Sequence, residues 1–269
     1  MELSENRKML QAWKSFELNV VYAGFARTGP EWRAEHVCSP FSRLYFILKG
    51  EGLAHCAGKT VRLREGCVYL IPAGLNFGYS CEAFMEQLFF HVNVNGQNGM
   101  DFFRDCGRIL EKKKEDGQGE KALELYRSER AADAFRLKGL LWEELAGFAE
   151  AAGLQETALQ SCSGLINRFF FLAQNPVSAS SHIRELAGQL HVSESTLSKR
   201  FRAETGMTPG AYLNRLVLDK ACQLLLSEEE SIAAVAERLG FSDQFYFTKY
   251  FRRQMNMTPS AYRKLMRRG

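Results

Sequence analysis

The last third of the chain contains one pattern twice, with a separation of about 50 residues, and this repeat limits most strongly how the chain can fold. The positions that match between the two copies are Lys199 and Lys249, Phe201 and Phe251, Pro209 and Pro259, and Tyr212 and Tyr262. Recurrence at a fixed spacing is typical of a duplicated supersecondary unit. The repeat therefore predicts two copies of one small helical unit.

Apolar spacing indicates that each copy is a pair of helices joined by a tight turn. The residues expected to face inward are Ile183, Leu186, Ala187, Leu190, Leu197 and Phe201 in the first copy, and Ile232, Val235, Ala236, Leu239, Phe247 and Phe251 in the second. Ser193 and Ser242 are expected to cap the second helix of each pair. A longer helix over 209–226 would span ~27 Å, which with its flanking turns suits two recognition helices about one ~34 Å DNA turn apart.

The second helix of each pair carries polar and cationic side chains on the side away from its core. These are Ser195, Ser198, Lys199 and Arg202 in the first copy, and Gln244, Phe245, Thr248, Lys249, Arg252 and Arg253 in the second. Glutamine can pair with adenine, lysine with guanine, and phenylalanine with a thymine methyl group, whereas the arginines near the helix ends suit phosphate. We therefore expect this surface to bind double-stranded DNA. A helical repeat with a merely solvated polar face is the alternative.

The charge distribution favours the DNA-binding interpretation. From residue 176 onward the chain has 14 Lys and Arg against 9 Asp and Glu, a balance of +5, whereas the first 175 residues have 21 against 22, a balance of −1. The basic excess thus lies in the duplicated segment, where phosphate contacts need it.

Other sequence features favour a cytoplasmic protein with no membrane partner. No apolar run approaches the ~18 residues of a membrane span. The N-terminus lacks the build of a secretory signal. The seven cysteines form an odd set without a C-x-x-C pair, which favours free thiols over a disulfide framework.

The first part of the chain has a different character. Short apolar or alternating runs at 18–25, 44–48, 61–63, 68–71 and 87–94, separated by glycine turns, predict a β-sandwich or small barrel of the jelly-roll kind. Helices are expected at 101–114, 119–130, 131–152 and 156–173. The sequence therefore predicts an α+β protein with a β-barrel at 1–99, a helical connecting segment at 100–173, and a DNA-binding domain at 174–269 whose linker is 174–181.

The chain resembles the AraC/XylS family of bacterial transcription regulators. The segments that carry the resemblance are 186–187, 197–201 and 206–209 in the first copy, and 232–236, 240–247, 249–251 and 257–262 in the second. The resemblance implies a cupin-like barrel that senses a small molecule, a dimerisation helix, and a regulator, more often an activator than a repressor, that acts with RNA polymerase. Many relatives have a small residue where this chain has Phe245, so its base preference stays open.

The cupin resemblance does not extend to a metal site. Residues 66–77 are similar to the second cupin motif, but Phe77 stands where a metal-binding cupin has histidine. His36, His55 and His91 are the remaining candidate ligands, and a metal centre of this kind needs several that converge. We therefore expect no metal, no cofactor and no enzymatic activity, and disfavour a cupin enzyme with a DNA-binding tail. A thiol redox sensor at Cys67, near Arg64, is a further alternative.

The strand expected near 43–49 gives the candidate effector site. Alternation places Arg43, Tyr45, Ile47 and Lys49 on one face, as a pocket wall, and Leu44, Phe46 and Leu48 on the other, against a second sheet. The resemblance adds Tyr79 and Glu86, so the expected effector-binding residues are Arg43, Tyr45, Lys49, Tyr79 and Glu86, with a sugar-like ligand. The alternative places Arg43 and Lys49 in solvent and Tyr79 in the core.

An apolar stripe on the helix expected over 131–152 concerns assembly. Leu137, Leu141, Leu145 and Phe148 recur at helical spacing. This stripe can pack on its own barrel or on a second subunit, and the resemblance favours a homodimer. A constitutive regulator whose barrel only dimerises stays open beside the effector-responsive one.

Overall fold

The structure is a computed structural model that describes residues 9, 13, 16–96, 98–113, 117–154, 162–226, 230–255 and 257–266. The chain forms two compact units. The first contains Met1–Gly96 and Asp101–Gln160, and the second contains Gln97–Met100 and Ser161–Gly269. These divisions differ from the expected ones at 99 and 173, because a short loop segment and the helix after residue 161 both belong to the second unit.

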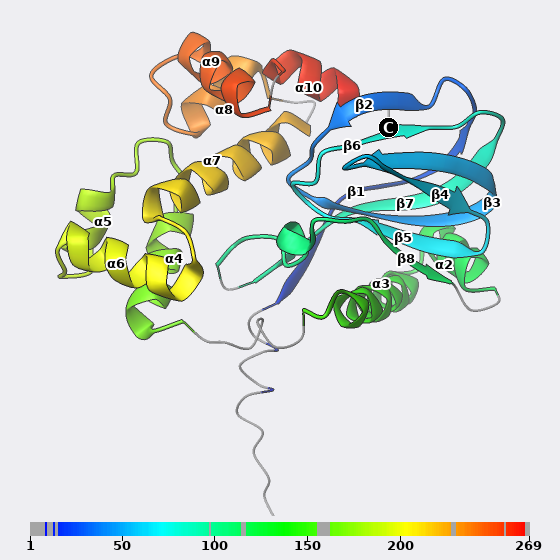
Figure 1. Cartoon of the computed structure of the whole chain (residues 1–269), viewed down its shortest axis with the longest axis horizontal. Helices are drawn as coiled ribbons and strands as arrows, with labels where there is room; N and C mark the ends of the chain where they lie inside the picture. Colours follow the sequence, from blue (N-terminus) through cyan, green and yellow to red (C-terminus); the bar gives the residue numbers. More distant parts are fainter. Residues whose placement is uncertain are drawn as a thin grey trace, which may run out of the picture. The chain divides into compact units, whose positions relative to one another are not determined.

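In the described part of the first unit, eight antiparallel strands form the sheets (Figure 1). They are β1 (Glu17–Thr28), β2 (Arg33–Val37), β3 (Ser42–Cys56), β4 (Lys59–Arg64), β5 (Cys67–Ile71), β6 (Phe77–Ser80), β7 (Met85–Asn95) and β8 (Leu110–Lys113). The five predicted strands lie within β1, β3, β4, β5 and β7. β2, β6 and β8 were not predicted, because they are short and gain their order from neighbouring strands.

The long strand β3 belongs to two sheets. Its residues 42–50 pair with β7 and β5, and its residues 51–56 pair with β4 and β6. The strand changes sheet at Gly50, where φ is +69° and an added Cβ would lie 2.2 Å from Phe84 O, so only glycine fits. The path β1-β7-β3-β5-β8 ends at β1 and β8, and no pairing among the described residues closes it. The unit is therefore an open sandwich, which is one of the two architectures that the sequence predicted, and the described strands do not close into a barrel.

Two helices, α2 (Gln118–Arg127) and α3 (Ala131–Ala152), cover one face of the β1-β7-β3-β5 sheet (Figure 1). The buried side chains at this contact include Leu44, Phe46, Leu88, Phe90, Leu141, Leu145 and Phe148. The apolar face of β3 thus packs on helices, not on the second sheet as expected. Three residues of the stripe on α3, Leu141, Leu145 and Phe148, are likewise buried against its own sheet, and Leu137 is half-buried there.

The prediction of a helix over 101–114 is wrong for the described residues 101–113. A short 3-10 helix, η1 (Arg104–Cys106), ends at Gly107, whose φ is +66°, and Leu110–Lys113 then pair with β5 as β8. The left-handed backbone at Gly107 stops the helical run, and the free edge of β5 supplies partners that an isolated helix would lack.

Seven helices form the described part of the second unit: α4 (Gly164–Gln174), α5 (Ile183–Gln189), α6 (Glu194–Thr205), α7 (Pro209–Leu226), α8 (Ile232–Arg238), α9 (Gln244–Met255) and α10 (Pro259–Met266). The predicted joining helix over 209–226 is confirmed as α7. The helix expected from 156 begins at 164, and residues 155–161 lie outside the described part. Within the described residues no helix has both the length and the apolar character that a membrane crossing needs.

Candidate DNA-binding surface and polar interior of the first unit

The first helix-turn-helix consists of α5 and α6. Its buried residues are Leu186, Ala187, Leu190, Leu197 and Phe201, as predicted. The amide of Val192 donates to Ala187 O at 3.0 Å and closes the turn. Ser193 Oγ accepts from Thr196 N at 3.1 Å and satisfies an amide that the helix start leaves without an intrahelical partner. The predicted cap at Ser193 is confirmed.

The second helix-turn-helix consists of α8 and α9, and its cap differs from the prediction. Asp243, not Ser242, accepts from the amide of Tyr246, at 2.8 Å, while the Ser242 hydroxyl donates to the same carboxylate at 3.1 Å. The bond from Tyr246 N lowers the pKa of the Asp243 carboxyl below its ordinary value, and the bond from Ser242 acts in the same direction.

The missed cap has a simple cause in the spacing of the two copies. The first helices begin 49 residues apart, at Ile183 and Ile232, whereas the second helices begin 50 apart, at Glu194 and Gln244. The second copy thus has one more residue between turn and recognition helix, so Asp243 takes the place of Ser193.

The predicted DNA-binding residues lie on the sides of α6 and α9 that face away from the core. Ser198 and Thr248 are half-buried, and the exposed ones are Ser195, Lys199, Arg202, Gln244, Phe245, Lys249, Arg252 and Arg253. Phe245 is 86% exposed, and its neighbour Tyr246, which the sequence analysis did not select, is 59% exposed. Two neighbouring aromatic side chains in solvent at the start of one helix are typical of a surface that a partner covers.

The cations on these two helices are available to bind an anion. Among the described residues, no ion pair involves Lys199, Arg202, Lys249, Arg252 or Arg253. Glu204, an acidic residue on α6, is held elsewhere, because its carboxylate accepts from Ser163 N at 2.7 Å and from Ser163 Oγ at 2.8 Å. This carboxylate therefore does not neutralise the positive charge on α6. Phosphate binding needs cations that are not already neutralised.

The interior of the first unit contains a buried arginine. Arg43 on β3 is 2% exposed, and it donates to Ser39 Oγ at 2.9 Å and to Tyr45 Oη at 3.3 Å. Its guanidinium carbon lies 5.4 Å from the ring centroid of Phe41 and 5.5 Å from that of Phe77. Phe77, at the position of the cupin histidine, thus packs against a cation.

Further polar groups border Arg43. His91 on β7 lies 3.4 Å from it, between Nε2 and Nη1, and stacks on Phe41 with 4.6 Å between ring centroids. Burial, reinforced by the charge of Arg43, lowers the pKa of His91 well below its usual range, so the ring is neutral. Tyr79 on β6 packs on Trp32 at 4.3 Å, and burial raises the pKa of its phenol. The site therefore has one strong donor group, neutral hydrogen-bonding groups and aromatic walls.

Two of the expected effector residues do not join this site. Lys49 is exposed and follows a bulge in β3. Glu86 lies on the other face of β7, in phase with Leu88 and Phe90, and it pairs with Arg27 at 2.8 Å. A β-bulge shifts the alternation of side chains, which is why a strict period of two placed Lys49 wrongly. The structure brings together Arg43, Tyr45 and Tyr79 only.

Sequence reasoning also missed other groups in this interior, and it considered His91 only as a metal ligand. His91 lies 48 residues from Arg43 and Trp32 lies 47 residues from Tyr79, whereas Ser39 and Phe41 are four and two residues from Arg43. The only sequence signal was Phe77, which the cupin spacing singled out. The other contacts depend on the β3 pairings, which periodicity alone does not fix.

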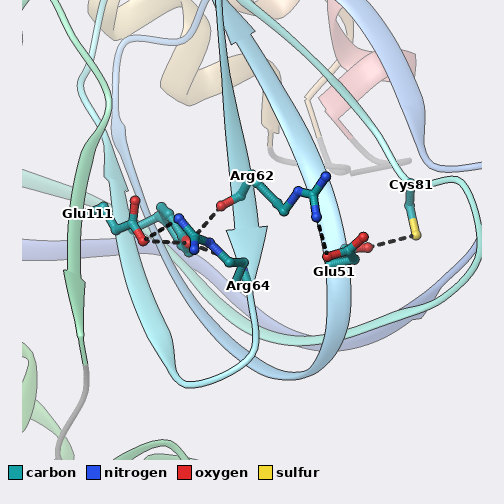
Figure 2. A network of polar contacts seen from close by, with 6 residues as sticks. Glu51, Arg62, Arg64, Cys81 and Glu111 are labelled. Atoms are coloured by element: carbon teal, nitrogen blue, oxygen red, sulfur yellow. Dashed lines mark hydrogen bonds and ion pairs between the residues drawn. The ribbon is translucent and has the colours of Figure 1, made fainter.

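The histidines and cysteines do not form a metal centre in the described part of the chain, where no group of three or more His, Cys, Asp or Glu could hold an ion. His55 is exposed and bonds Thr60 at 3.0 Å, far along β3 from the interior. None of the seven cysteines, all within the described residues, forms a disulfide, and burial raises the pKa of Cys56, Cys81 and Cys162. Figure 2 shows Cys81, whose thiol donates to Glu51 O at 3.5 Å, beside the Arg62–Glu51 and Arg64–Glu111 ion pairs. A raised pKa is the opposite of what a reactive thiol needs.

Two capped recognition helices with available cations, in a chain that also has a β-sandwich unit, define a DNA-binding transcription regulator with a double helix-turn-helix. Residues 12–171 match the model of an AraC-binding-like domain, and residues 186–265 match that of a helix-turn-helix domain. The chain belongs to the AraC family of transcription regulators.

Known relatives are similar over different lengths. The Msm operon regulatory protein of Streptococcus mutans is 22% identical over 266 residues, which are 93% of this chain and 94% of that protein. The HTH-type transcriptional activator RhaS of Escherichia coli is 33% identical over 125 residues, 46% of this chain and 45% of that protein. The match therefore spans less than half of RhaS.

Among solved structures, ToxT from Vibrio cholerae has a similar fold. Its TM-score is 0.58 at 14% identity, and the match covers 93% of this chain and 98% of that one. At this level of identity the likeness concerns the fold alone, which is α+β as predicted.

Proposed function

We propose that this regulator binds a specific DNA site through α6 and α9, in two adjacent major-groove segments, and that a small polar metabolite in the first unit changes this binding. The observation that carries the DNA part is the pair of capped helices whose cations form no ion pair among the described residues. Lys199 and Gln244 read base edges, and Arg253 contacts phosphate.

Enrichment of a random pool of DNA duplexes with the full-length protein tests this part. We expect two short conserved blocks about one helical turn, ~10 base pairs, apart. Binding should weaken steeply with salt, because phosphate contacts release counterions. A pool that yields one block, or no conserved block, would contradict the proposal.

The effector part of the proposal depends on the interior around Arg43. A buried guanidinium beside two phenols suits a hydroxylated or anionic metabolite, such as a sugar or a sugar acid, because each polar group of the ligand would find a partner. ToxT, which has the same fold, has been solved with a bound unsaturated fatty acid, so a chain of this fold can bind a small molecule.

A thermal-shift screen would compare neutral pentoses and hexoses with sugar acids and sugar phosphates. We expect a ligand from one of these three groups of compounds to raise the midpoint of thermal unfolding of the wild-type protein. This shift should be lost in Arg43→Gln and in Tyr79→Phe. Lys49→Gln is the matched control, because Lys49 is exposed, and it should keep the shift. Equal shifts in all four proteins would place the ligand elsewhere.

The remaining parts of the proposal are activation and assembly. RhaS is described as a transcriptional activator, and we propose that this chain likewise activates nearby genes for the use of a carbohydrate or another small metabolite, together with RNA polymerase. We also propose a homodimer, through a surface other than the buried stripe of α3. Sedimentation of the full chain at micromolar concentration tests the dimer, and a monomer in the presence of enriched DNA would contradict it.

A further inference from the structure

The second unit contains a piece of chain that the repeat does not include. Residues 98–100 lie in a loop that leaves β7 and re-enters the first unit at Asp101, yet they belong to the second unit. Met100 is 5% exposed and lies in the same apolar core as Phe170 of α4 and Phe201 of α6. This core thus depends on a side chain supplied from within the first unit's sequence.

A buried hydrogen bond holds the same segment. Tyr212 on α7 is 1% exposed, and its Oη donates to Asn98 O at 2.6 Å and accepts from Gln174 Nε2 at 3.3 Å. Burial raises the pKa of Tyr212, so the phenol keeps the proton that it donates. Gly99 has φ +67°, and a Cβ there would lie 2.6 Å from the Gln174 side chain, so the segment fits closely. A buried phenol that loses its partner is destabilising, which ties α7 to the segment.

Two side chains, Tyr212 and Phe201, connect this segment to the recognition helix α6. The ring centroid of Tyr212 lies 5.4 Å from that of Phe201 and 5.2 Å from that of Phe170. Phe201 is on the inward side of α6, and the outward side of the same helix carries Lys199 and Arg202. A shift of Met100 or Tyr212 therefore changes the support on which α6 rests.

The other end of the segment is fixed to the strands that carry the polar interior. Asp101 is buried, and its carboxylate accepts from Ser42 Oγ at 2.8 Å and from Val94 N at 2.9 Å. Ser42 directly precedes Arg43 on β3, and Val94 follows His91 on β7. A ligand that moved these strands would move the base of the segment through two hydrogen bonds and the covalent chain.

We propose that segment 98–100 is a positioning element of the first helix-turn-helix, which passes a change in the interior around Arg43 to α6 and not to α9. The proposal rests on the effector response proposed above and specifies its route. The two states are the segment seated in the core, with Tyr212 bonded to Asn98, and the segment withdrawn, with α6 less well supported. Met100 and Tyr212 act on DNA binding only through the position of α6.

The second copy supplies a matched control. Tyr262 occupies the place of Tyr212 there, buried, with its ring 5.4 Å from that of Phe251 on α9. The same substitution in the two copies removes one hydroxyl under each recognition helix. Only in the first copy does that hydroxyl donate to segment 98–100.

Amide hydrogen exchange of the full chain, followed separately over α6 and α9, tests the proposal without DNA or effector. Tyr212→Phe should speed exchange in α6 about 3- to 10-fold, the range expected for one net hydrogen bond, and leave α9 unchanged. Arg43→Gln should change exchange in α6 by at least ~3-fold. In the double variant the two effects should not multiply, because they act on one route.

The controls separate coupling from a general loss of stability. In the Tyr262→Phe background, Arg43→Gln should change exchange in α6 as much as it does in the wild-type protein. Ser42→Ala, which removes the bond to Asp101 but leaves Arg43 in place, gives a second perturbation if Arg43→Gln does not fold. The proposal is overturned if both perturbations leave α6 unchanged, or if their effects in the Tyr212→Phe background equal those in wild type. Failure to enrich a DNA site would contradict the proposed function and not this result.

Discussion

The two helix-turn-helix units have the same arrangement of helices, but they differ in the residue at the left-handed turn and in the residue that caps the recognition helix. At the turn the backbone is left-handed, with φ +56° at His191 and +72° at Gly240. At the start of the recognition helix the cap is a hydroxyl in the first copy and a carboxylate in the second. Glycine takes the left-handed turn without the steric cost that histidine meets there. The same fold position can thus be filled at different steric cost.

The copies also differ in what covers their cores. In the first copy α4 and segment 98–100 complete the core of α5 and α6. In the second copy α7 packs on α8, and α10 packs on α9 and α7. α7 therefore packs on both copies, on α6 of the first and on α8 of the second. α4 packs on the first copy, where it contacts α5 and α6.

The largest expected difference concerns the two core phenylalanines. Phe201→Ala and Phe251→Ala should each destabilise the second unit by about 3–5 kcal/mol. Phe201→Ala should lower the free energy of unfolding more than Phe251→Ala does, because the centroid of the Phe201 ring lies within 6 Å of those of Phe169, Phe170 and Tyr212. Circular dichroism during urea unfolding is the measurement, since all three tryptophans lie at 13, 32 and 142, outside this unit. Equal losses would mean that α4 adds nothing to the first core.

A second prediction compares base reading by the two helices. Lys199→Ala and Gln244→Ala should each weaken specific DNA binding by about 1–3 kcal/mol and relax preference in different blocks of the site. Arg253→Ala should weaken all sequences alike and reduce the salt slope by about one. Binding titrations on the enriched duplex and on single-block mutants measure these effects. If both of the first two variants bind normally, the outward face has been assigned wrongly.

The turn residues should respond in opposite directions. His191→Gly should stabilise the second unit by about 0.5–1 kcal/mol, because glycine relieves a left-handed histidine. Gly240→Ala should destabilise it by about 1–2 kcal/mol, since φ is +72° and the new Cβ would lie 2.4 Å from Ser178 Oγ. His191→Ala is the control, because it keeps the steric cost, and it should change stability little. Thermal melts followed by circular dichroism suffice.

The smallest effect is a difference in acid sensitivity. The pKa of Asp243 is lowered in the folded chain, so its stabilising contribution is present above the ordinary value of 3.8 and is lost as pH falls through the lower folded value. The hydroxyl cap Ser193 does not titrate. Below pH 4, α9 should lose protection against exchange before α6 does, and Asp243→Ser should remove that difference. Simultaneous loss in both helices would contradict it.

Local signals predicted the second unit well and the first unit only in outline. The joining helix over 209–226 and the cap at Ser193 follow from residues within a few positions of each other. Asp243 was missed because an inserted residue shifts the register of the two copies by one. The interior around Arg43 was predicted only in part, because His91 reaches it through the β3–β7 pairing, which joins residues 48 positions apart in the chain. Neither periodicity nor composition predicted that residues 98–100 belong to the second unit.

The loop at Met100 also sets an order in which the molecule can be completed during synthesis. Strand β1 finds its partner only when residues up to Asn95 have been made, since Glu17 pairs with Asn95. Met100 then has to wait longer, because Phe170 and Tyr212 follow it by 70 and 112 residues. A chain that stops before α4 leaves this methionine without its core partners and open to unwanted contacts, and one that stops before α7 still lacks Tyr212. The DNA-reading half is therefore finished last, around a side chain that was made before any of its own helices.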